Sequence, residues 1–459
     1  MTQLAAKEIK PSAAMLKPLG VLVIGRKRPG FDQEWNDIIR GRSLETLRIL
    51  GYAPVGVDSP VVDNATIRAA IDDIRDRGCR AIVVLQPSLG DGQLSFTLMQ
   101  HWQAPVVLWA TPERQDSEKV SSCSLVAQHL WCANFRQANH PFELVYGDPH
   151  DQSVQQPLQQ AIQLCEAVHA LRRAKVGQIG SHAPGYISMG ADPFTMRKKL
   201  GAQLHDLSLV QFIERVRAVA QREVDQDVQR VQAMQIALNG ISAMHLEINS
   251  RYYLAIRELM AEEQLDALAM QEWPELPNVL GQWPYLAMSR VADEGGAISM
   301  EGDTDAALTF MLGSLAGAGN AFITDWLEHD ERTINFWHPG TAPLGMCENA
   351  SLALHFNNGK PIVIDGELRL DEPVTVARLW RCDDQYHMMA FEGRTVPPRR
   401  KLTGNSGLVE LTGGDVPQWF DALCHAGMPH HPVLFYGHHR ERFRRLARLL
   451  NVQWLAKHD

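Results

Sequence analysis

The chain has 459 residues, of which 45% are hydrophobic and 21% charged, and its formal net charge at pH 7 is -9. At roughly 100 to 200 residues per domain, this length predicts two to four domains, and the near-average composition excludes a largely disordered chain. The charge is mild and acidic, so it favours no nucleic-acid partner.

The longest apolar runs, at 20–25 and 81–85, are far shorter than the roughly 20 residues that cross a bilayer. We therefore expect no membrane partner. Residues 1–17 contain no continuous apolar stretch and are predicted to be a loose leader rather than a signal peptide, so a cytoplasmic location follows by default. The seven cysteines are scattered and form no C-x-x-C pair, which favours reduced thiols over disulfides or a zinc knuckle.

Short β-branched runs alternate with helical stretches through the first third of the chain. Strands are predicted at 20–26, 81–86 and 105–110, and helices at 35–50 and 65–77. Continuous apolar strands separated by helices are typical of a parallel sheet that is covered on both faces. We therefore predict a doubly wound α/β domain over residues 18–172.

A second α/β domain is predicted over residues 173–320. It begins after a helix at 155–173, with a strand at 176–180 and a Gly/Pro-rich loop at 182–193. A long, polar helical stretch is predicted around 205–265, and another buried strand at 267–271.

The pattern changes after about residue 320. Strands are predicted at 351–356, 361–369, 373–381 and 386–391, separated by turn-forming glycines in the manner of an antiparallel meander. An amphipathic helix at 440–450 should turn Leu446, Leu449 and Leu450 inward, and a last strand is predicted at 452–455. The predicted fold class is α/β, with two doubly wound α/β domains followed by a C-terminal antiparallel β domain over residues 321–459.

Several common motifs are missing from the sequence. It contains no G-x-x-x-x-G-K-[ST] phosphate loop and no G-x-G-x-x-G after a strand, so we expect no nucleotide cofactor. It also lacks a G-x-S-x-G nucleophile elbow, which disfavours an α/β-hydrolase.

Two carboxylates in the second half of the chain are candidates for chemistry. Glu301 lies two residues before Asp303, which precedes an apolar helix at 304–315; a helix-capping Asp303 and a solvated Glu301 are the simpler interpretation. Asp325 follows an apolar run that resembles the end of a buried strand, where carboxylates tend to face ligand crevices. An ordinary turn aspartate is the alternative there.

The third candidate is His431, in the segment GMPHHP at 427–432. His-rich segments often chelate metals only adventitiously at the surface. Two carboxylates and a neutral imidazole, with no thiolate, would nevertheless form an oxygen-rich site suited to Mn²⁺ or Mg²⁺ rather than to structural zinc. Sequence separation alone leaves open whether the three residues converge.

Three stretches, EGDTDAAL at 301–308, ITDW at 323–326 and GMPHHPVLFYGHHRERFRRLARLLNV at 427–452, together resemble the L-fucose isomerase and L-arabinose isomerase superfamily. Further similarity, such as AIVVLQPSLGDGQ and RRAKVGQIGSHAPGY, covers almost the whole chain. The resemblance is greatest to the shorter L-fucose isomerase-like proteins, and it implies two α/β domains before a C-terminal antiparallel domain.

The resemblance implies roles for individual residues. Glu301 and Asp325 would bind a divalent metal and flank the sugar, and His431 would be the imidazole ligand. His430 would orient the substrate. His338 lies where arabinose isomerases place another metal-binding histidine, whereas fucose isomerases use three protein ligands. The implied ion is Mn²⁺, with Mg²⁺ or Co²⁺ as alternatives.

Two local features leave alternatives open. The segment His338-Pro339-Gly340 departs from the H-C-G pattern of the family, which puts the geometry of this loop in question. Trp273, Trp326 and Trp337 lie near the candidate residues, and their indoles could pack at a domain interface or form a wall against the apolar face of a sugar. We place Trp326 among the substrate-binding residues, together with His430 and His338.

The resemblance and the site chemistry predict a metal-dependent aldose–ketose isomerase. The metal would hold O1 and O2 of the sugar as Lewis acid and template, while Glu301 or Asp325 moves a proton between C2 and C1 through a cis-enediol. The family also implies a homo-oligomer, a trimer or hexamer. Alternatives are an inactive sugar-binding or regulatory protein, or a metal-dependent aldolase or dehydratase of a related sugar acid. The sugar stays open among 6-deoxyhexoses, pentoses and anionic hexoses such as a sulfonated glucose.

Overall fold

The computed structural model describes residues 16–26 and 30–456, and the chain divides into two compact units, Met1–His169 and Ala170–Asp459. Most of the predicted leader, residues 1–15, lies outside the described residues. The predicted domain boundaries at 172 and 320 stay predictions.

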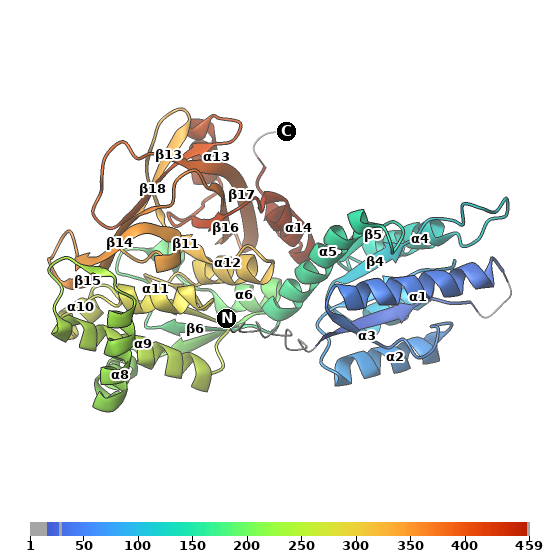
Figure 1. The fold of residues 1–459 in the computed structure, drawn as a ribbon, viewed down its shortest axis with the longest axis horizontal. Coiled ribbons are helices and arrows are strands. Elements are labelled where there is room, and N and C mark those ends of the chain that lie inside the picture. Colours follow the sequence, from blue (N-terminus) through green and yellow to red (C-terminus); the bar gives the residue numbers. More distant parts are fainter. Residues whose placement is uncertain (1–15, 27–29, 457–459) are drawn as a thin grey trace, which may run out of the picture. The chain divides into compact units, whose positions relative to one another are not determined.

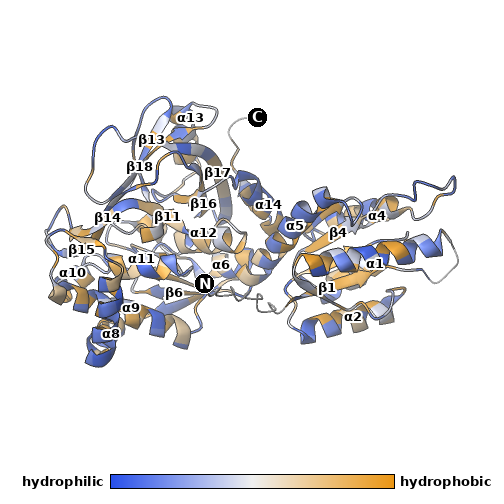
Figure 2. Cartoon of the chain, viewed as in Figure 1, coloured by the Kyte–Doolittle hydropathy of each residue, from blue (hydrophilic) through white to orange (hydrophobic). Residues whose placement is uncertain are grey.

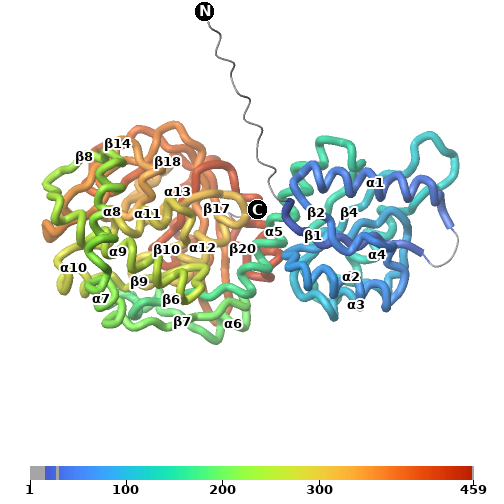
Figure 3. The backbone as a smooth tube through the Cα atoms, turned by 60° about the horizontal axis from the view of Figure 1, so that its bottom comes forward, coloured from blue at the N-terminus to red at the C-terminus, as the bar shows by residue number. Residues whose placement is uncertain are grey.

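The first unit is built on a five-stranded parallel sheet with the order β2-β1-β3-β4-β5 (Figures 1 and 3). Its strands are β1 (Lys17–Val23), β2 (Tyr52–Val55), β3 (Ile82–Leu85), β4 (Val106–Ala110) and β5 (Phe142–Tyr146). Its helices are α1 (Gln33–Ile49), α2 (Asn64–Asp76), α3 (Leu94–His101), α4 (Ser124–Gln137) and α5 (Gln152–Leu171). One apolar core joins the sheet to α2, α3 and α4, and a second joins its other face to α1 and α5. Helices on both faces confirm the doubly wound prediction.

The second unit contains a four-stranded parallel sheet with the order β10-β9-β6-β7. Its strands are β6 (Lys175–Ile179), β7 (Gln203–Leu207), β9 (Ala267–Met270) and β10 (Ala297–Ser299). The accompanying helices are η1 (Ile187–Met189), α6 (Pro193–Leu200), α7 (Leu209–Ala218), α8 (Gln221–Ala233), α9 (Ala243–Glu262), α10 (Glu275–Val279), α11 (Tyr285–Asp293) and α12 (Thr304–Leu315). The single helical stretch predicted at 205–265 is wrong. A strand ends at Leu207, Ser208 caps α7 by accepting from the Gln211 N–H, and Gly240 turns the chain with a φ of 74°.

The same unit ends in a large, mainly antiparallel sheet with the order β11-β19-β16-β17-β18-β15-β14-β8. Its strands are β8 (Ala237–Leu238), β11 (Ala321–Ile323), β12 (Asp325–His329), β13 (Thr333–His338), β14 (Cys347–Leu354), β15 (Pro361–Leu368), β16 (Pro373–Cys382), β17 (Gln385–Val396), β18 (Asn405–Leu411), β19 (Val433–Tyr436) and β20 (Gln453–Trp454). The remaining helices are η2 (Leu344–Met346), α13 (Val416–His425) and α14 (Arg440–Leu450). The predicted strands and the inward leucines of α14 are confirmed. The strand order differs from a simple meander because β18 lies between β17 and β15.

Helix α12 connects the two sheets of the second unit. It packs against β9 and β10 of the parallel sheet and against β16 and β19 of the large sheet (Figure 1). Its first ten residues are buried almost throughout, as expected of a helix that is apolar on all sides. Figure 2 shows the contrast with α8, which is largely hydrophilic. The start of α12 therefore lies deep in this unit, where both sheets meet it.

Two further expectations from the sequence can be compared with the structure. All seven cysteines are free thiols, as predicted. Among the described residues, no helix combines the length and apolarity needed to cross a membrane.

Gly313 is expected to be required for the packing of α12. A Cβ at this position would lie 2.4 Å from Cζ of Phe435. Alanine would gain about 1 kcal/mol of helix propensity, but overpacking costs roughly 1–3 kcal/mol, so Gly313→Ala should lower the thermal unfolding temperature. Gly41 in α1 is the matched control, because its Cβ would meet nothing within 4 Å; Gly41→Ala should raise the unfolding temperature. A stabilising Gly313→Ala would contradict the tight packing of α12.

Candidate active site

The register between β11 and β19 brings Asp325 and His431 together. Ile323 pairs with Val433 in this antiparallel ladder. Two residues further along, the same register sets Asp325 opposite His431, and the Thr324 N–H donates to the Pro432 carbonyl at 3.0 Å. Asp325, the first residue of β12, thus lies opposite His431, which lies two residues before β19.

Glu301 reaches the same place from the parallel sheet. It follows β10 in a tight turn and has a left-handed backbone, with a φ of 58°. Its N–H donates to Oε2 of the fully buried Glu272 at 2.7 Å. The next residue, Gly302, has a φ of 72°, and a Cβ there would lie 2.0 Å from the Ser181 carbonyl oxygen. The turn is therefore held against neighbouring backbone and positions the Glu301 side chain.

Three buried polar atoms converge without a hydrogen-bond partner: Glu301 Oε2, Asp325 Oδ1 and His431 Nε2. His431 Nε2 lies 3.6 Å from the Glu301 oxygen and 3.7 Å from the Asp325 oxygen. Two sets of three possible ligand atoms each lie within 4.8 Å of one another: Glu301 with His430 and His431, and Asp325 with His338 and His431. His431 is common to both sets, and neighbouring ligands of a Mg²⁺-sized ion with bonds of about 2.1 Å would lie roughly 3 Å apart. Buried polar groups without partners are rare, and these fit the predicted metal site.

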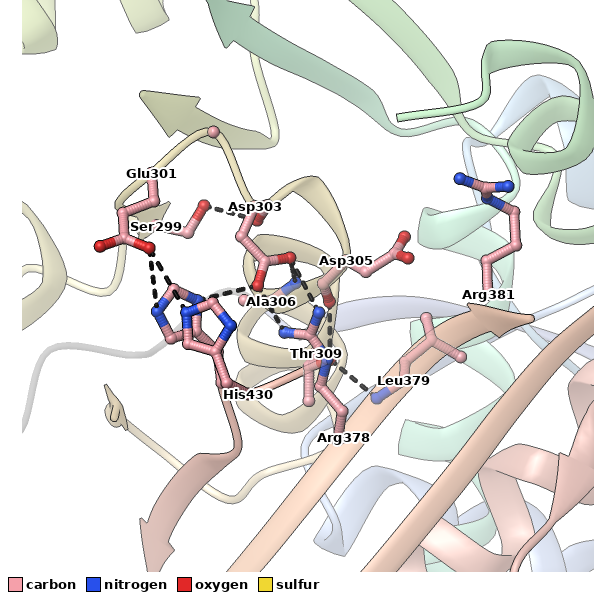
Figure 4. Close-up of polar contacts among 12 residues, drawn as sticks. Ser299, Glu301, Asp303, Asp305, Ala306, Thr309, Arg378, Leu379, Arg381 and His430 are labelled. Carbon is pink, nitrogen blue, oxygen red and sulfur yellow. Dashed lines mark hydrogen bonds and ion pairs between the residues drawn. The ribbon is translucent and has the colours of Figure 1, made fainter. Parts of the chain in front are cut away.

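The other ring nitrogen of His431 contacts Asp303. Nδ1 lies 3.0 Å from Asp303 Oδ2, and the two Asp303 oxygens each accept from the Arg378 guanidinium at 2.9 Å. Figure 4 shows this arrangement, with Glu301 on the opposite side of the histidines. Burial acts to raise the pKa of Asp303, but the Arg378 charge and the His431 contact hold it well below its usual value. Burial lowers the pKa of His431, but its carboxylate neighbours, Asp303 first, raise it above the usual value.

His430 lies at the open side of the cluster. Its Nε2 is 3.5 Å from Glu301 Oε2 and 3.9 Å from Asp325 Oδ1, and the side chain is 40% exposed. The Tyr186 ring lies 5.0 Å from the His430 ring and 6.3 Å from the Trp273 ring, centroid to centroid. These exposed aromatic side chains border the cluster on the side from which a ligand could enter.

His338 also lies in the cluster. It offers one of three ligand atoms, with Asp325 and His431, that all lie within 4.8 Å of one another. Its Nδ1 is 3.1 Å from the Thr341 hydroxyl. Burial, together with the neighbouring histidines, holds the pKa of His338 well below its usual value. A neutral, buried imidazole beside Asp325 is a suitable further ligand.

Trp326 is the one predicted site residue that the structure places elsewhere. Its indole packs against Phe336, Phe391 and Phe420 in the apolar core of the large sheet. Successive side chains of a strand point to opposite faces, so Asp325 directed at the cluster turns Trp326 away from it. The geometry does not support a role for Trp326 in binding a substrate.

Several residues at the site were not singled out for chemistry from the sequence. Asp303 was interpreted only as a helix cap, which it is, since it accepts from the Ala306 N–H. Glu272 lies two residues after β9, at the edge of the parallel sheet where β10 also ends, and a carboxylate at this edge could have been recognised from the sequence. The partnership of Arg378 with Asp303 had no local signal, because the two are 75 residues apart.

A groove of about 1040 Å³ lies along α7, α8 and α9, away from this cluster. Among its lining residues, Arg215 is paired with Glu258 and Glu262, and Arg257 with Glu294. Paired surface charges of this kind are ordinary, so the groove does not compete with the cluster as the candidate site.

Comparisons with known proteins show which proteins this chain is similar to. Residues 23–172 match the family model described as the N-terminal domain of fucose/sulfoquinovose isomerase. A sulfoquinovose isomerase of Priestia aryabhattai is 26% identical over 436 residues, covering 94% of this chain and 97% of that protein. One of Alkalicoccus urumqiensis is 24% identical, covering 81% and 85%. An L-arabinose isomerase of Thermotoga neapolitana is 26% identical, covering 41% and 39%. The resemblance inferred from the sequence is confirmed.

Gly302→Ala should displace the turn that carries Glu301. The backbone carbonyl of Ser181 leaves no room for the Cβ, so we expect lower stability and a loss of Mn²⁺ affinity of about 10- to 100-fold, as when residues that orient metal ligands are changed. Gly295→Ala is the control, because Gly295 also has a positive φ, 86°, but open space around it. Isothermal titration with Mn²⁺ should separate the two, and equal affinities would disprove the positioning of Glu301 by this contact.

Proposed function

We propose that this chain, a relative of the L-fucose isomerase and L-arabinose isomerase superfamily, is a metal-dependent aldose–ketose isomerase. The observation that carries the proposal is the convergence of Glu301 Oε2, Asp325 Oδ1 and His431 Nε2, all buried and unpartnered. Two carboxylates and one imidazole suit a hard divalent ion such as Mn²⁺. Glu301, Asp325 and His431 would hold the ion, and His338 is the candidate for a fourth ligand.

For the substrate, we propose an anionic aldose of the sulfoquinovose type. The sulfoquinovose isomerases of Priestia aryabhattai and Alkalicoccus urumqiensis align over 94% and 81% of this chain. The L-arabinose isomerases of Thermotoga align over 41% to 57%. Alignment over nearly the full length, rather than over about half of the chain, favours the first class. Assays of this chain with sulfoquinovose, L-fucose and L-arabinose would test the choice.

The chemistry assigned to this chain's own residues is proton transfer. A bound divalent ion would supply Lewis-acid polarisation of the sugar's neighbouring oxygens. Glu301 or Asp325 would take the proton from C2 and the same or the other carboxylate would return it at C1, through a cis-enediol. His430, half-exposed beside both carboxylates, would orient the sugar, with Tyr186 and Trp273 against its apolar face.

Two alternatives are less well supported. A sugar-binding protein without catalysis has no need for two carboxylates within 3.7 Å of one imidazole nitrogen. An aldolase or dehydratase of a sugar acid shares the enolisation step, and product analysis distinguishes it. A cytoplasmic location and assembly into a trimer or hexamer stay predictions.

Activity is expected to require a divalent ion. Chelation should abolish turnover and Mn²⁺ should restore it. His431→Ala should weaken Mn²⁺ binding by more than about 100-fold, beyond the effect of changing a residue that only supports a ligand. His430→Ala should weaken it much less, because the His430 side chain is 40% exposed whereas that of His431 is fully buried. Calorimetric metal titration is the measurement, and equal affinities of the two variants would refute the assignment of His431.

Glu301→Gln and Asp325→Asn should each lower turnover by roughly 10²- to 10⁴-fold at saturating Mn²⁺, the contribution typical of a positioned acid or base. Both changes preserve volume, so the fold should survive. The measurement is kcat, with circular dichroism to verify folding. Near wild-type turnover in either variant would remove that residue from the mechanism.

Solvent isotope incorporation tests the proton-transfer route itself. Ketose formed in D₂O should carry deuterium at C1, because a carboxylate that holds the proton exchanges it with water. Substrate deuterated at C2 should show a primary isotope effect and should lose part of its label to water. Complete transfer of the C2 hydrogen to C1 at every reaction time, with no solvent deuterium in the ketose, would contradict a carboxylate base that exchanges with water.

A further inference from the structure

We propose that Arg378 is a positioning residue for His431, and that it acts through Asp303 to direct the His431 Nε2 lone pair at Glu301 and Asp325. The inference rests on the proposed function, since it concerns the imidazole ligand of the proposed metal site. It assigns a role to a buried arginine that touches neither the sugar nor the ion.

The side chains of Arg378, Asp303 and His431 form a buried chain of contacts. The Arg378 and His431 side chains are fully buried and that of Asp303 is 1% exposed. Arg378 Nη1 and Nη2 donate to Asp303 Oδ2 and Oδ1, each at 2.9 Å, and His431 Nδ1 lies 3.0 Å from Oδ2. Figure 4 shows the Arg378 guanidinium facing the Asp303 carboxylate. A two-pronged contact fixes the plane of the carboxylate as well as its position.

The hydrogen-bond count determines which nitrogen of His431 carries the proton. Asp303 accepts two bonds from Arg378 and one from the Ala306 N–H at 2.9 Å. An ionised carboxylate has about four acceptor sites and no donor, so the remaining contact requires a proton on His431 Nδ1. In the neutral ring, Nε2 then carries the lone pair, as a metal ligand requires.

The backbone supports the position of Arg378. It lies in β16, and the next residue, Leu379, donates its N–H to the Thr309 hydroxyl of α12 at 3.0 Å. Asp303 caps the same helix. The strand that carries the arginine and the helix that begins at the aspartate are thus joined at a second point, which keeps the guanidinium facing the carboxylate. Lysine cannot reproduce the contact, because its single ammonium group lacks the planar pair of N–H donors that a guanidinium presents to a carboxylate.

The chain offers a matched control. Arg290 and Asp227 form another buried two-pronged pair in the same unit, at 2.7 and 2.8 Å. The Arg290 guanidinium lies 3.6 Å from the centroid of the Tyr253 ring, and the pair joins α8 to α11. Breaking a buried ion pair destabilises a protein wherever the pair lies, so Arg290→Lys reports the structural cost alone.

The test uses the full-length, metal-free protein and Mn²⁺ alone as the probe. Arg378→Lys should weaken Mn²⁺ affinity by about 10- to 100-fold, the range found for residues that orient metal ligands. Arg290→Lys should lower the unfolding temperature to a similar degree and leave Mn²⁺ affinity unchanged. Wild-type affinity in Arg378→Lys, or an equal loss in both variants, would overturn the proposal.

A second variant serves if Arg378→Lys does not fold. Asp303→Asn is isosteric, and its amide can donate to Nδ1, which would move the ring proton to Nε2 and abolish ligation. Nitrogen NMR of the isotope-labelled histidines in metal-free protein should detect the Nδ1 proton of His431 in the wild type and its loss in this variant. Absence of a proton from Nδ1 of His431 in the wild type would overturn the inference. Failure of the wild type to bind Mn²⁺ would instead refute the proposed function, which keeps the two failures distinct.

Discussion

The antiparallel register between β11 and β19 determines which side chains meet at the site. Ile323 pairs with Val433, and because alternate residues of a strand share a face, the adjoining positions on that face are Asp325 and His431. A slip of one residue would exchange the buried His431 for the half-exposed His430. Strand β19 also pairs with β16, where Ala377 lies opposite Val433, and this second register sets Arg378 beside the same end of β19. A few backbone hydrogen bonds thus decide which side chains the large sheet contributes, while Glu301 and Asp303 come from the turn between β10 and α12.

Much of the fold could be predicted because buried parallel strands have a strong local signal. The runs IVVL of β3 and VVLWA of β4 are wholly buried and are continuous apolar segments in the sequence. The edge strand β7 was missed because its residues, QLHDL, are partly exposed and lack that signal. The position of β18 between two hairpins depends on pairings between distant segments, which turn residues do not encode.

The site was predicted in part. Resemblance singled out Glu301, Asp325 and His431, and the structure brings them together, but local chemistry alone left a helix cap and a turn aspartate as adequate explanations. Asp303 is indeed a cap, so the cap interpretation was correct and also concealed its contacts with Arg378 and His431. The placement of Trp326 beside the substrate disregarded the two-residue period of a strand, which directs it into the core once Asp325 faces the cluster.

The proposed ligands come from segments attached to two different sheets, and this has a thermodynamic consequence. Glu301 follows a strand of the parallel sheet, whereas Asp325 begins a strand of the large sheet and His431 lies two residues before another. An ion bound by all three residues would link the two sheets, and it would bind only when the sheets are packed in the folded unit. Its free concentration would then set the heat resistance of this unit, adding about 2.7 kcal/mol at a hundred times the dissociation constant. In cells depleted of the ion, this unit would be less stable and the proposed activity would be lost.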